Sequence, residues 1–274
     1  MKTLPIALLL VSSLSVASSS EMPSTEKKVK STAGINFVEV DAASFMMGSP
    51  HDDGLRGDDE DQVAVRLSKF WISETEVSWR QLNEITGAGS AEYVLRRPIK
   101  AEELDLPVVG KGYFELDYFF RALTSRCIDE KVFASGAANL PTEAQWEYVA
   151  KNGSNAILSE RALWSIAQEN NENIGPLSNG PRVRVCGYSK PNRFGCRDML
   201  GNVLELCRDV YTTKLPGGDD PFVHSGDIRQ LFFVVKGGNC FGDISDSRAS
   251  RRGFVKPGAA PSHVGFRVVW ESQK

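Results

Sequence analysis

The sequence lacks an excess of positive charge. Its 274 residues include 32 Lys and Arg against 35 Asp and Glu, which gives a formal net charge of −3. A nucleic-acid-binding protein needs a basic patch or stripe to meet phosphates, and this sequence offers none. Hydrophobic residues make up 41% of the chain and charged residues 24%, the balance of an ordinary globular protein. The composition therefore predicts no nucleic-acid partner.

Long apolar runs are also missing after the first twenty residues, so no transmembrane segment is expected. The start itself combines the charge of Lys2, an apolar run over residues 5–11 and small residues at 15–17, which predicts a signal peptide over residues 1–17. Residues 18–34 are rich in Ser, Lys and Glu and predict a flexible leader. No cysteine follows the apolar run, which argues against a lipid anchor. The sequence therefore predicts an exported protein, periplasmic or secreted.

Cys-x-x-Cys pairs are absent, which excludes a zinc ribbon and a thioredoxin-type motif. An odd number of cysteines in an oxidising compartment leaves at least one thiol without an intramolecular partner. One or two disulfides are expected around residues 186–207, with no pairing fixed by the sequence, and a small buried hydrophobic residue is the alternative for each cysteine. The five cysteines are Cys127, Cys186, Cys196, Cys207 and Cys240.

Histidine is scarce as well. His51, His224 and His263 are far apart, and none lies in a His-rich helix. A Ser-His-Asp signature, a phosphate-binding loop and a His-Glu-x-x-His motif are all missing. The sequence thus indicates none of these common catalytic chemistries.

Strand and helix patterns both occur, and helix becomes rare after residue 164. Alternating or β-branched apolar residues predict strands, whereas apolar residues at helical spacing predict helices. Ser78 suits an N-cap, and Thr142 with Gln145 matches a capping box. With no internal repeat or linker, these patterns predict a single α+β domain over residues 35–274. The predicted strands are 35–45, 63–72, 231–236 and 263–270, and the predicted helices are 79–85, 113–125 and one beginning at 142.

A Gly-Asn turn at Gly201 organises the most informative stretch, residues 195–209. Asp198 and Glu205 flank this turn, and backbone carbonyls lie between them. Ca²⁺ takes several oxygen ligands from carboxylates and carbonyls, so the turn is a candidate calcium site. A polar turn with two solvated acids is the alternative, and from the residue types alone it is favoured. The acidic loop at residues 51–62 allows the same two interpretations, and a solvated loop held by Arg56 is favoured there.

Five segments, taken together and in this order, resemble the formylglycine-generating enzyme (sulfatase-modifying factor) family. They span nearly the whole chain after the leader. The resemblance implies a variant C-type-lectin-like α+β fold with little regular secondary structure. The segments are residues 47–49 with Arg56, Asp59 and Glu60; 70–77; 140–148; 198–205; and 236–239 with Arg248, Arg252 and 265–267.

The resemblance also implies metal ligands. It places a structural calcium on Asp198, Gly201, Val203 and Glu205, which raises the calcium interpretation of the turn above the solvated one. A second calcium site of the family would begin at Asn173 and Ile174, but the loop that follows offers no Asp to complete it.

The catalytic residues of the family are not retained. Its oxidase chemistry uses two cysteines that bind Cu(I), and those positions hold Gly242 and Ser247 here. Two thiolates suit Cu(I), and Cys240 alone does not replace them. A branch of the family uses iron held by clustered histidines, which this chain lacks. Copper and iron are therefore not expected, and formylglycine-generating activity is not predicted.

Two functional hypotheses follow. The first is a cell-envelope binding, accessory or maturation protein that acts on an exported protein, peptide or glycan through the loops at 51–62, 180–194 and 216–227. The alternative is a divergent metal-dependent oxidoreductase that modifies an exported peptide or secondary metabolite, as in siderophore maturation. In that case Cys240, His224 and His263 are the candidate catalytic residues. Arg248, Arg252 and Arg267 are predicted to pair with buried acids or carbonyls and to hold the fold.

Overall fold

The computed structural model describes residues 29–153, 165, 168–170, 172–174, 182–224, 231–256, 258–259 and 261–272. Within these residues the strands form three sheets, and most of the helix lies in the first half of the chain. This mixture confirms the predicted α+β class. Among the residues of the second half that the structure describes, helix is rare, as predicted.

The largest sheet has five strands in the order β1-β2-β5-β12-β6, all of them antiparallel. Its middle is strongly apolar, because Ile72 of β5 pairs with Val38 on one side and with Val269 on the other. The last strand of the chain therefore lies inside the sheet rather than at its edge. The bounds are β1 Val29–Thr32, β2 Ile35–Val40, β5 Phe70–Ser73, β12 Val269–Glu271 and β6 Ala137–Asn139.

The other two sheets are smaller. One has the order β10-β9-β7-β11, in which β11 runs parallel to β7, and the other has the order β3-β4-β8, in which β8 runs parallel to β4. The first contains β10 Gly253–Val255, β9 Phe233–Lys236, β7 Leu204–Val210 and β11 Val264–Gly265. The second contains β3 Ala43–Met47, β4 Val63–Leu67 and β8 Gly218–Asp219.

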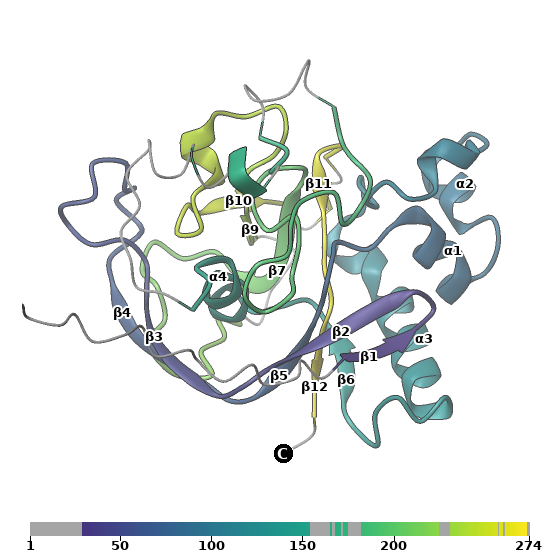
Figure 1. Cartoon of the computed structure of the whole chain (residues 1–274), viewed down its shortest axis with the longest axis horizontal. Helices are drawn as coiled ribbons and strands as arrows, with labels where there is room; N and C mark the ends of the chain where they lie inside the picture. The colour runs from purple at the N-terminus through teal and green to yellow at the C-terminus, as the bar shows by residue number, and fades with distance from the viewer. Residues whose placement is uncertain are drawn as a thin grey trace, which may run out of the picture.

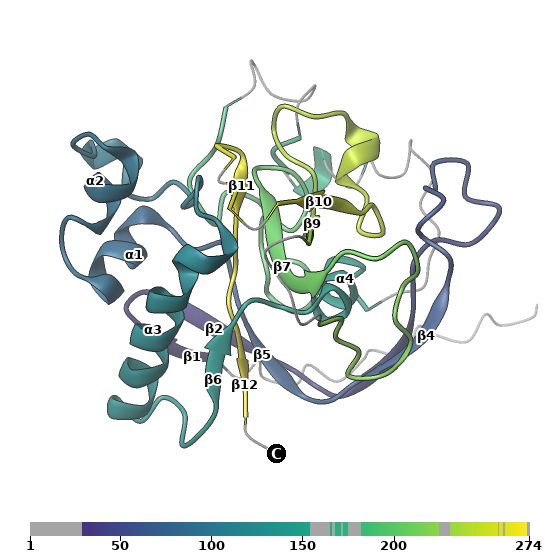
Figure 2. The same ribbon diagram turned by 180° about the vertical axis from the view of Figure 1, so that it is seen from behind.

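Helices α1, α2 and α3 gather on one side of β12, whereas α4 lies on the other side beside β7 (Figures 1 and 2). No described helix has both the length and the apolar character that crossing a membrane requires. The α-helices are α1 Trp79–Thr86, α2 Ser90–Leu95, α3 Asp117–Asp129 and α4 Glu143–Ala150, and the short 3₁₀ segments are η1 Ala101–Glu103, η2 Tyr113–Leu116 and η5 Ile244–Ser247.

Both predicted helix starts are confirmed. Ser78 accepts a hydrogen bond from the backbone N–H of Gln81, and the Gln81 side chain accepts one from the Ser78 N–H. Thr142 and Gln145 make the same reciprocal pair at α4. Each box satisfies two backbone donors that the helix itself leaves free.

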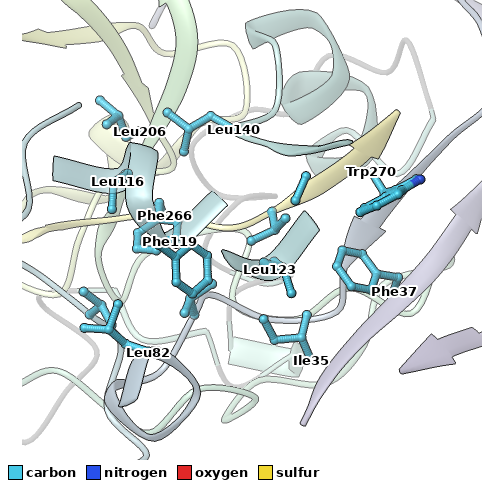
Figure 3. Packing of buried hydrophobic residues seen from close by; sticks show 14 of the residues in the cluster. Ile35, Phe37, Leu82, Leu116, Phe119, Leu123, Leu140, Leu206, Phe266 and Trp270 are labelled. Atoms are coloured by element: carbon cyan, nitrogen blue, oxygen red, sulfur yellow. The ribbon is translucent and has the colours of Figure 1, made fainter. Parts of the chain in front are cut away.

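Two hydrophobic cores lie on the two sides of the large sheet. The first packs α1 and α3 against the sheet, and its residues include Leu82, Phe119, Leu123, Phe266 and Trp270 (Figure 3). The second surrounds Trp146 of α4 and includes residues from all three sheets. The charged residues described below lie beside this second core.

The predicted leader extends too far toward the domain. Its last part forms β1, which pairs with β2 from Val29 opposite Val38 to Thr32 opposite Ile35. Lys30 also ties β1 to the domain, because its ammonium group lies 4.4 Å from the centroid of the Phe133 ring. Val29 is the only apolar residue of this segment, so the segment carries no strand signal. Pairing with the apolar strand β2 decides the structure here. Residues 1–28, which include the predicted signal peptide, lie outside the described residues.

Candidate functional site

The Gly-Asn turn leads directly into β7 and is fixed by contacts from distant segments. The Gly201 N–H donates to the Gly237 carbonyl at 2.7 Å, and the Asn202 N–H donates to the Asn173 carbonyl at 2.8 Å. Gly201 has a φ of 82°, and a Cβ atom there would lie 2.5 Å from the Asn173 oxygen. Only glycine combines this backbone conformation with such a close approach.

Glu205, the predicted calcium ligand after the turn, is held by an arginine. Arg267 donates to both Glu205 carboxylate oxygens at 2.6 Å, and the Trp146 indole N–H donates to Oε2 at 2.7 Å. Glu205 and Arg267 are almost fully buried. This bidentate pair confirms that Arg267 pairs with a buried acid, and it commits both Glu205 oxygens to protein donors.

Asp198, the predicted ligand before the turn, points toward a different loop. Its Oδ1 accepts the Ser189 N–H at 2.8 Å, and its Oδ2 accepts the N–H groups of Gly187 and Tyr188. The Asp198 N–H donates in return to the Ser189 hydroxyl at 2.6 Å. The two predicted carboxylates thus have separate sets of donors. Calcium binding through Asp198, Gly201, Val203 and Glu205 stays a prediction.

Two further acids border this turn, and the sequence reasoning missed both. Glu76 is fully buried, and Asn202 donates to its Oε1 at 2.9 Å, but its Oε2 has no hydrogen-bond partner. The buried Oε2 of Glu172 has no partner either. A buried carboxylate oxygen without a donor is costly, so burial at these two atoms disfavours the ionised carboxylates.

Burial and neighbouring charge change the pKa of both acids in the same direction. Burial and the Asp198 carboxylate raise the pKa of Glu76 and that of Glu172 well above the usual range. Glu205 raises both further, whereas Arg267 lowers them. The surroundings of the turn are therefore rich in acid, and the neutral forms of Glu76 and Glu172 are favoured there.

The second implied calcium site is not assembled from the described residues. Asn173 uses its side-chain amide to donate to the Asn202 side chain at 2.9 Å and to the Arg182 carbonyl at 2.8 Å. Ile174 is buried. Residues 175–181 lie outside the described residues, and the loop that continues from them offers no Asp to complete this site.

The two positions that hold copper cysteines in the family lie in one segment around η5. An added Cβ atom at Gly242 would meet no heavy atom closer than 3.6 Å. Ser247 is buried, and its hydroxyl has no partner. The space for two side chains is thus present, but neither residue supplies a thiolate.

The weak catalytic candidates do not form an evident site. Cys240 is fully buried, and burial raises the pKa of its thiol to about 11. His224 is exposed beside Phe222, and His263 is half-buried. No three His, Cys, Asp or Glu side chains in the described part of the chain are placed to form a metal cluster.

The expected disulfides are not formed in this structure. None of the five cysteines is joined in a disulfide, and four of them are buried, whereas Cys186 is partly buried. Burial raises the pKa of Cys127 to about 12 and that of Cys207 well above its usual range. The alternative interpretation, a small buried hydrophobic residue, fits these cysteines.

The acidic loop at 51–62 is held by two arginines. Arg56 forms the predicted ion pair, with Asp61 as its partner. Glu60, however, is fully buried and accepts two hydrogen bonds from Arg248 at 2.8 and 2.9 Å. The loop is thus mostly solvated, with one acid turned inward to an arginine from a distant segment.

Comparisons with known proteins place this chain in a family. The sequence profile of the sulfatase-modifying factor enzyme 1-like domain (FGE-sulfatase) matches residues 21–272. The formylglycine-generating enzyme of Streptomyces coelicolor is 25% identical over 303 residues, which cover 90% of this chain and 92% of the enzyme. The serine/threonine-protein kinase pkn1 of Chlamydia pneumoniae is 31% identical over 133 residues, and this match spans only 20% of the kinase's length.

A solved structure shows the same fold. PvdO from Pseudomonas aeruginosa superposes with a TM-score of 0.72 and 21% identity, covering 92% of this chain and all of that one. The predicted C-type-lectin-like α+β fold is therefore confirmed.

Proposed function

Because this chain belongs to the sulfatase-modifying factor enzyme 1-like (FGE-sulfatase) domain family, we propose that it uses the family's fold to bind an exported protein or peptide and does not generate formylglycine. The observation that carries this proposal is the replacement of the two copper-binding cysteines by Gly242 and Ser247. Cu(I) is a soft ion that needs thiolate ligands, and glycine and serine provide none.

The nearby cysteine does not compensate for this loss. A thiol acts as a metal ligand or nucleophile in its thiolate form, and the raised pKa of Cys240 keeps that thiol protonated at neutral pH. His224 and His263 lie in separate loops, which favours the binding role over a metal-dependent oxidoreductase. Export is part of the proposal and rests on the predicted signal peptide over residues 1–17.

Loops around the domain present aromatic side chains suited to binding. Tyr188 and Phe222 are exposed, and the guanidinium groups of Arg184 and Arg208 lie 5.2 and 4.4 Å from their ring centroids. Phe241, directly beside Gly242, is 56% exposed. Aromatic residues and arginine dominate the energetics of protein interfaces, so these loops are the proposed contact surface.

The lack of oxidase chemistry is tested by comparing the wild-type protein with the double variant Gly242→Cys/Ser247→Cys. Each is loaded with Cu(I) and dialysed against a competing thiol. It is then incubated with O₂, a reductant and a cysteine-containing peptide. We expect the wild type to retain no copper and the double variant to retain about one Cu(I) per chain, because two thiolates form a suitable site. Copper retention and conversion of cysteine to aldehyde by the wild type would overturn the proposal.

The binding role is tested by photo-crosslinking in cells that export the protein. A photoreactive phenylalanine analogue replaces Tyr188, Phe222 or Phe241, and the matched control places it at Tyr93, an 83% exposed residue on α2. We expect one defined crosslinked partner from the loop positions and none from position 93. Equal crosslinking from all four positions would count against a specific surface.

A further inference from the structure

A cavity of about 750 Å³ lies between the start of α3 and strand β6. These two elements lie beside each other in both views of the domain (Figures 1 and 2). The volume falls within the range of roughly 300–1,000 Å³ that is usual for ligand-binding sites. None of Tyr188, Phe222 and Phe241 lines the cavity, so it is not part of the contact surface proposed above.

Aromatic side chains form the apolar part of this cavity, and the core holds two of them in place. Tyr113 stacks on Phe233 with 3.8 Å between the ring centroids. Phe120 packs edge-on against Phe266, with 5.9 Å between their centroids. Phe114 also lines the cavity, and it is 44% exposed. Rings that the protein already fixes lose little freedom when a ligand binds, so this wall is preorganised.

Strand β6 forms the other wall, and two backbone donors along it are already capped. β6 is an edge strand that pairs with β12, and no further described strand pairs with its outer side. The Ala138 N–H donates to the Thr124 hydroxyl at 3.0 Å, and the Leu140 N–H donates to the Asn139 side chain at 2.9 Å. A peptide that added to this edge as a strand would need free backbone donors there. The cavity therefore suits a compact ligand better than an extended peptide.

The polar side chains that line the cavity carry no net charge. Asp117 and Arg121 form an ion pair one turn apart on α3, and both side chains stay largely exposed. Thr124, Ser125 and Asn139 add hydroxyl and amide groups to the lining. A carboxylate and a guanidinium each make several hydrogen bonds, and one ion pair uses only part of that capacity. The wall therefore offers donors and acceptors side by side, and its two charges balance.

We propose that this cavity binds a neutral saccharide of one or two sugar rings, with a ring face against Phe114 and hydroxyl groups on Asp117 and Arg121. The C–H groups on a sugar face carry small positive charges, which suit the negative face of an aromatic ring. Sugar hydroxyls both donate and accept, and the lining presents both kinds of partner. A neutral ligand fits because a charged one would compete with the ion pair for one of its members. This inference goes beyond the proposed function and does not rest on it.

The test begins with isothermal titration of the wild-type protein with cellobiose and with N,N′-diacetylchitobiose, two neutral disaccharides with flat apolar faces. We expect a Kd of about 1 mM or below for at least one of them. Chitobiose without its acetyl groups is cationic, and cellobiouronic acid is anionic, and we expect each to bind about tenfold more weakly than its neutral counterpart. No binding of either neutral sugar, or tighter binding of a charged one, would overturn the proposal. Tighter binding of an extended pentapeptide of Val and Thr would also overturn it, in favour of strand addition.

The variants Phe114→Ala and Arg121→Ala then locate the bound sugar. We expect Phe114→Ala to raise the Kd about tenfold, because it removes the exposed aromatic face. Arg121→Ala changes a largely exposed side chain, should raise the Kd about fivefold, and keeps the test valid if Phe114→Ala fails to fold. The matched control is Tyr118→Ala, which removes a 65% exposed ring of the same helix that does not line the cavity, and it should keep the wild-type Kd. An unchanged Kd in both cavity variants, or an equal loss in Tyr118→Ala, would overturn the assignment to this cavity.

Discussion

Two regions of this domain bury charged side chains, and they do so in opposite ways. Around α4, the oxygens of Glu143 and Glu147 all have donors, supplied mainly by Lys236, Lys151 and Arg252. Around the Gly-Asn turn, Arg267 interacts with three acids, Glu76, Glu172 and Glu205, and two carboxylate oxygens have no donor. The first network is complete within the chain, whereas the second is not.

The pKa values show the same contrast. Burial alone would raise the pKa of Glu147, but Lys236 and Lys151 lower it to about 2. Burial raises the pKa of Glu76, and Asp198 and Glu205 raise it further. A complete network therefore stabilises the ionised acid, whereas the incomplete one favours a neutral acid or a bound cation.

Removing Arg267 should have the largest effect on stability. The change Arg267→Met leaves Glu205 buried without its partner beside three other acids. We expect a loss of about 5 kcal/mol in the free energy of unfolding, at the upper end for a broken buried pair. Urea denaturation in the presence of EDTA measures it. The control is Arg80→Met, which removes an exposed pair with Asp105 and should cost at most about 1 kcal/mol. A similar small loss for Arg267→Met would contradict the role of this pair.

Breaking the complete network should cost somewhat less. Lys236 is fully buried, with its ammonium 3.0 Å from Glu147 and 3.7 Å from Glu143. The change Lys236→Met should lower the free energy of unfolding by about 3 kcal/mol, because Lys151 and Arg252 still compensate part of the charge. Addition of Glu147→Gln should recover part of the loss in the same denaturation experiment. An additive further loss in the double variant would show that the two residues do not interact.

The smallest of these effects is a pH dependence at the start of α4. Asp209 accepts the N–H groups of Glu143 and Val223 at 2.8 and 3.0 Å, and burial together with Glu143 raises its pKa from 3.8 to about 7. Between these values the unfolded chain releases the proton while the folded protein keeps it, so stability falls as pH rises. We expect Asp209 to contribute a loss of about 2 kcal/mol between pH 5 and 7.

The change Asp209→Asn removes this titration. It should flatten the loss of stability between pH 5 and 7 in thermal melts, although its single carbonyl oxygen lowers stability at pH 5. Asp243→Asn, at a solvated position with a lowered pKa, is the control and should keep the wild-type profile in this range. An unchanged slope in Asp209→Asn would show that another group titrates.

Local signals in the sequence predicted much of the fold but little of the charge pairing. Capping boxes at Ser78 and Thr142 depend on residues three positions apart, so the sequence shows them directly. The helix predicted at 113–125 is also present, although its first turn is the 3₁₀ segment η2 and α3 continues to Asp129. The spacing of apolar residues and the capping of helices are properties of neighbouring residues, so the sequence predicts these helices directly.

Pairs between distant residues could not be read in the same way. Glu143 and Glu147 lie four positions apart on α4 and would normally face water, but their partners come from β9 and from Arg252. The motif containing Asp198 and Glu205 was found, yet Glu76 and Glu172 were not, because nothing in their neighbouring residues distinguishes them from solvated acids. The burial of an acid depends on which distant segments cover it.

The position of β12 determines when this domain can complete its fold. Val269–Glu271 joins β5 to β6, so the five-stranded sheet stays divided until β12 has been synthesised and has paired with both strands. Before that moment, β5 and β6 each expose an unpaired edge, which can bind other chains. Trp270 closes this gap, because it lies opposite Trp71 of β5 on one side and Ala138 of β6 on the other.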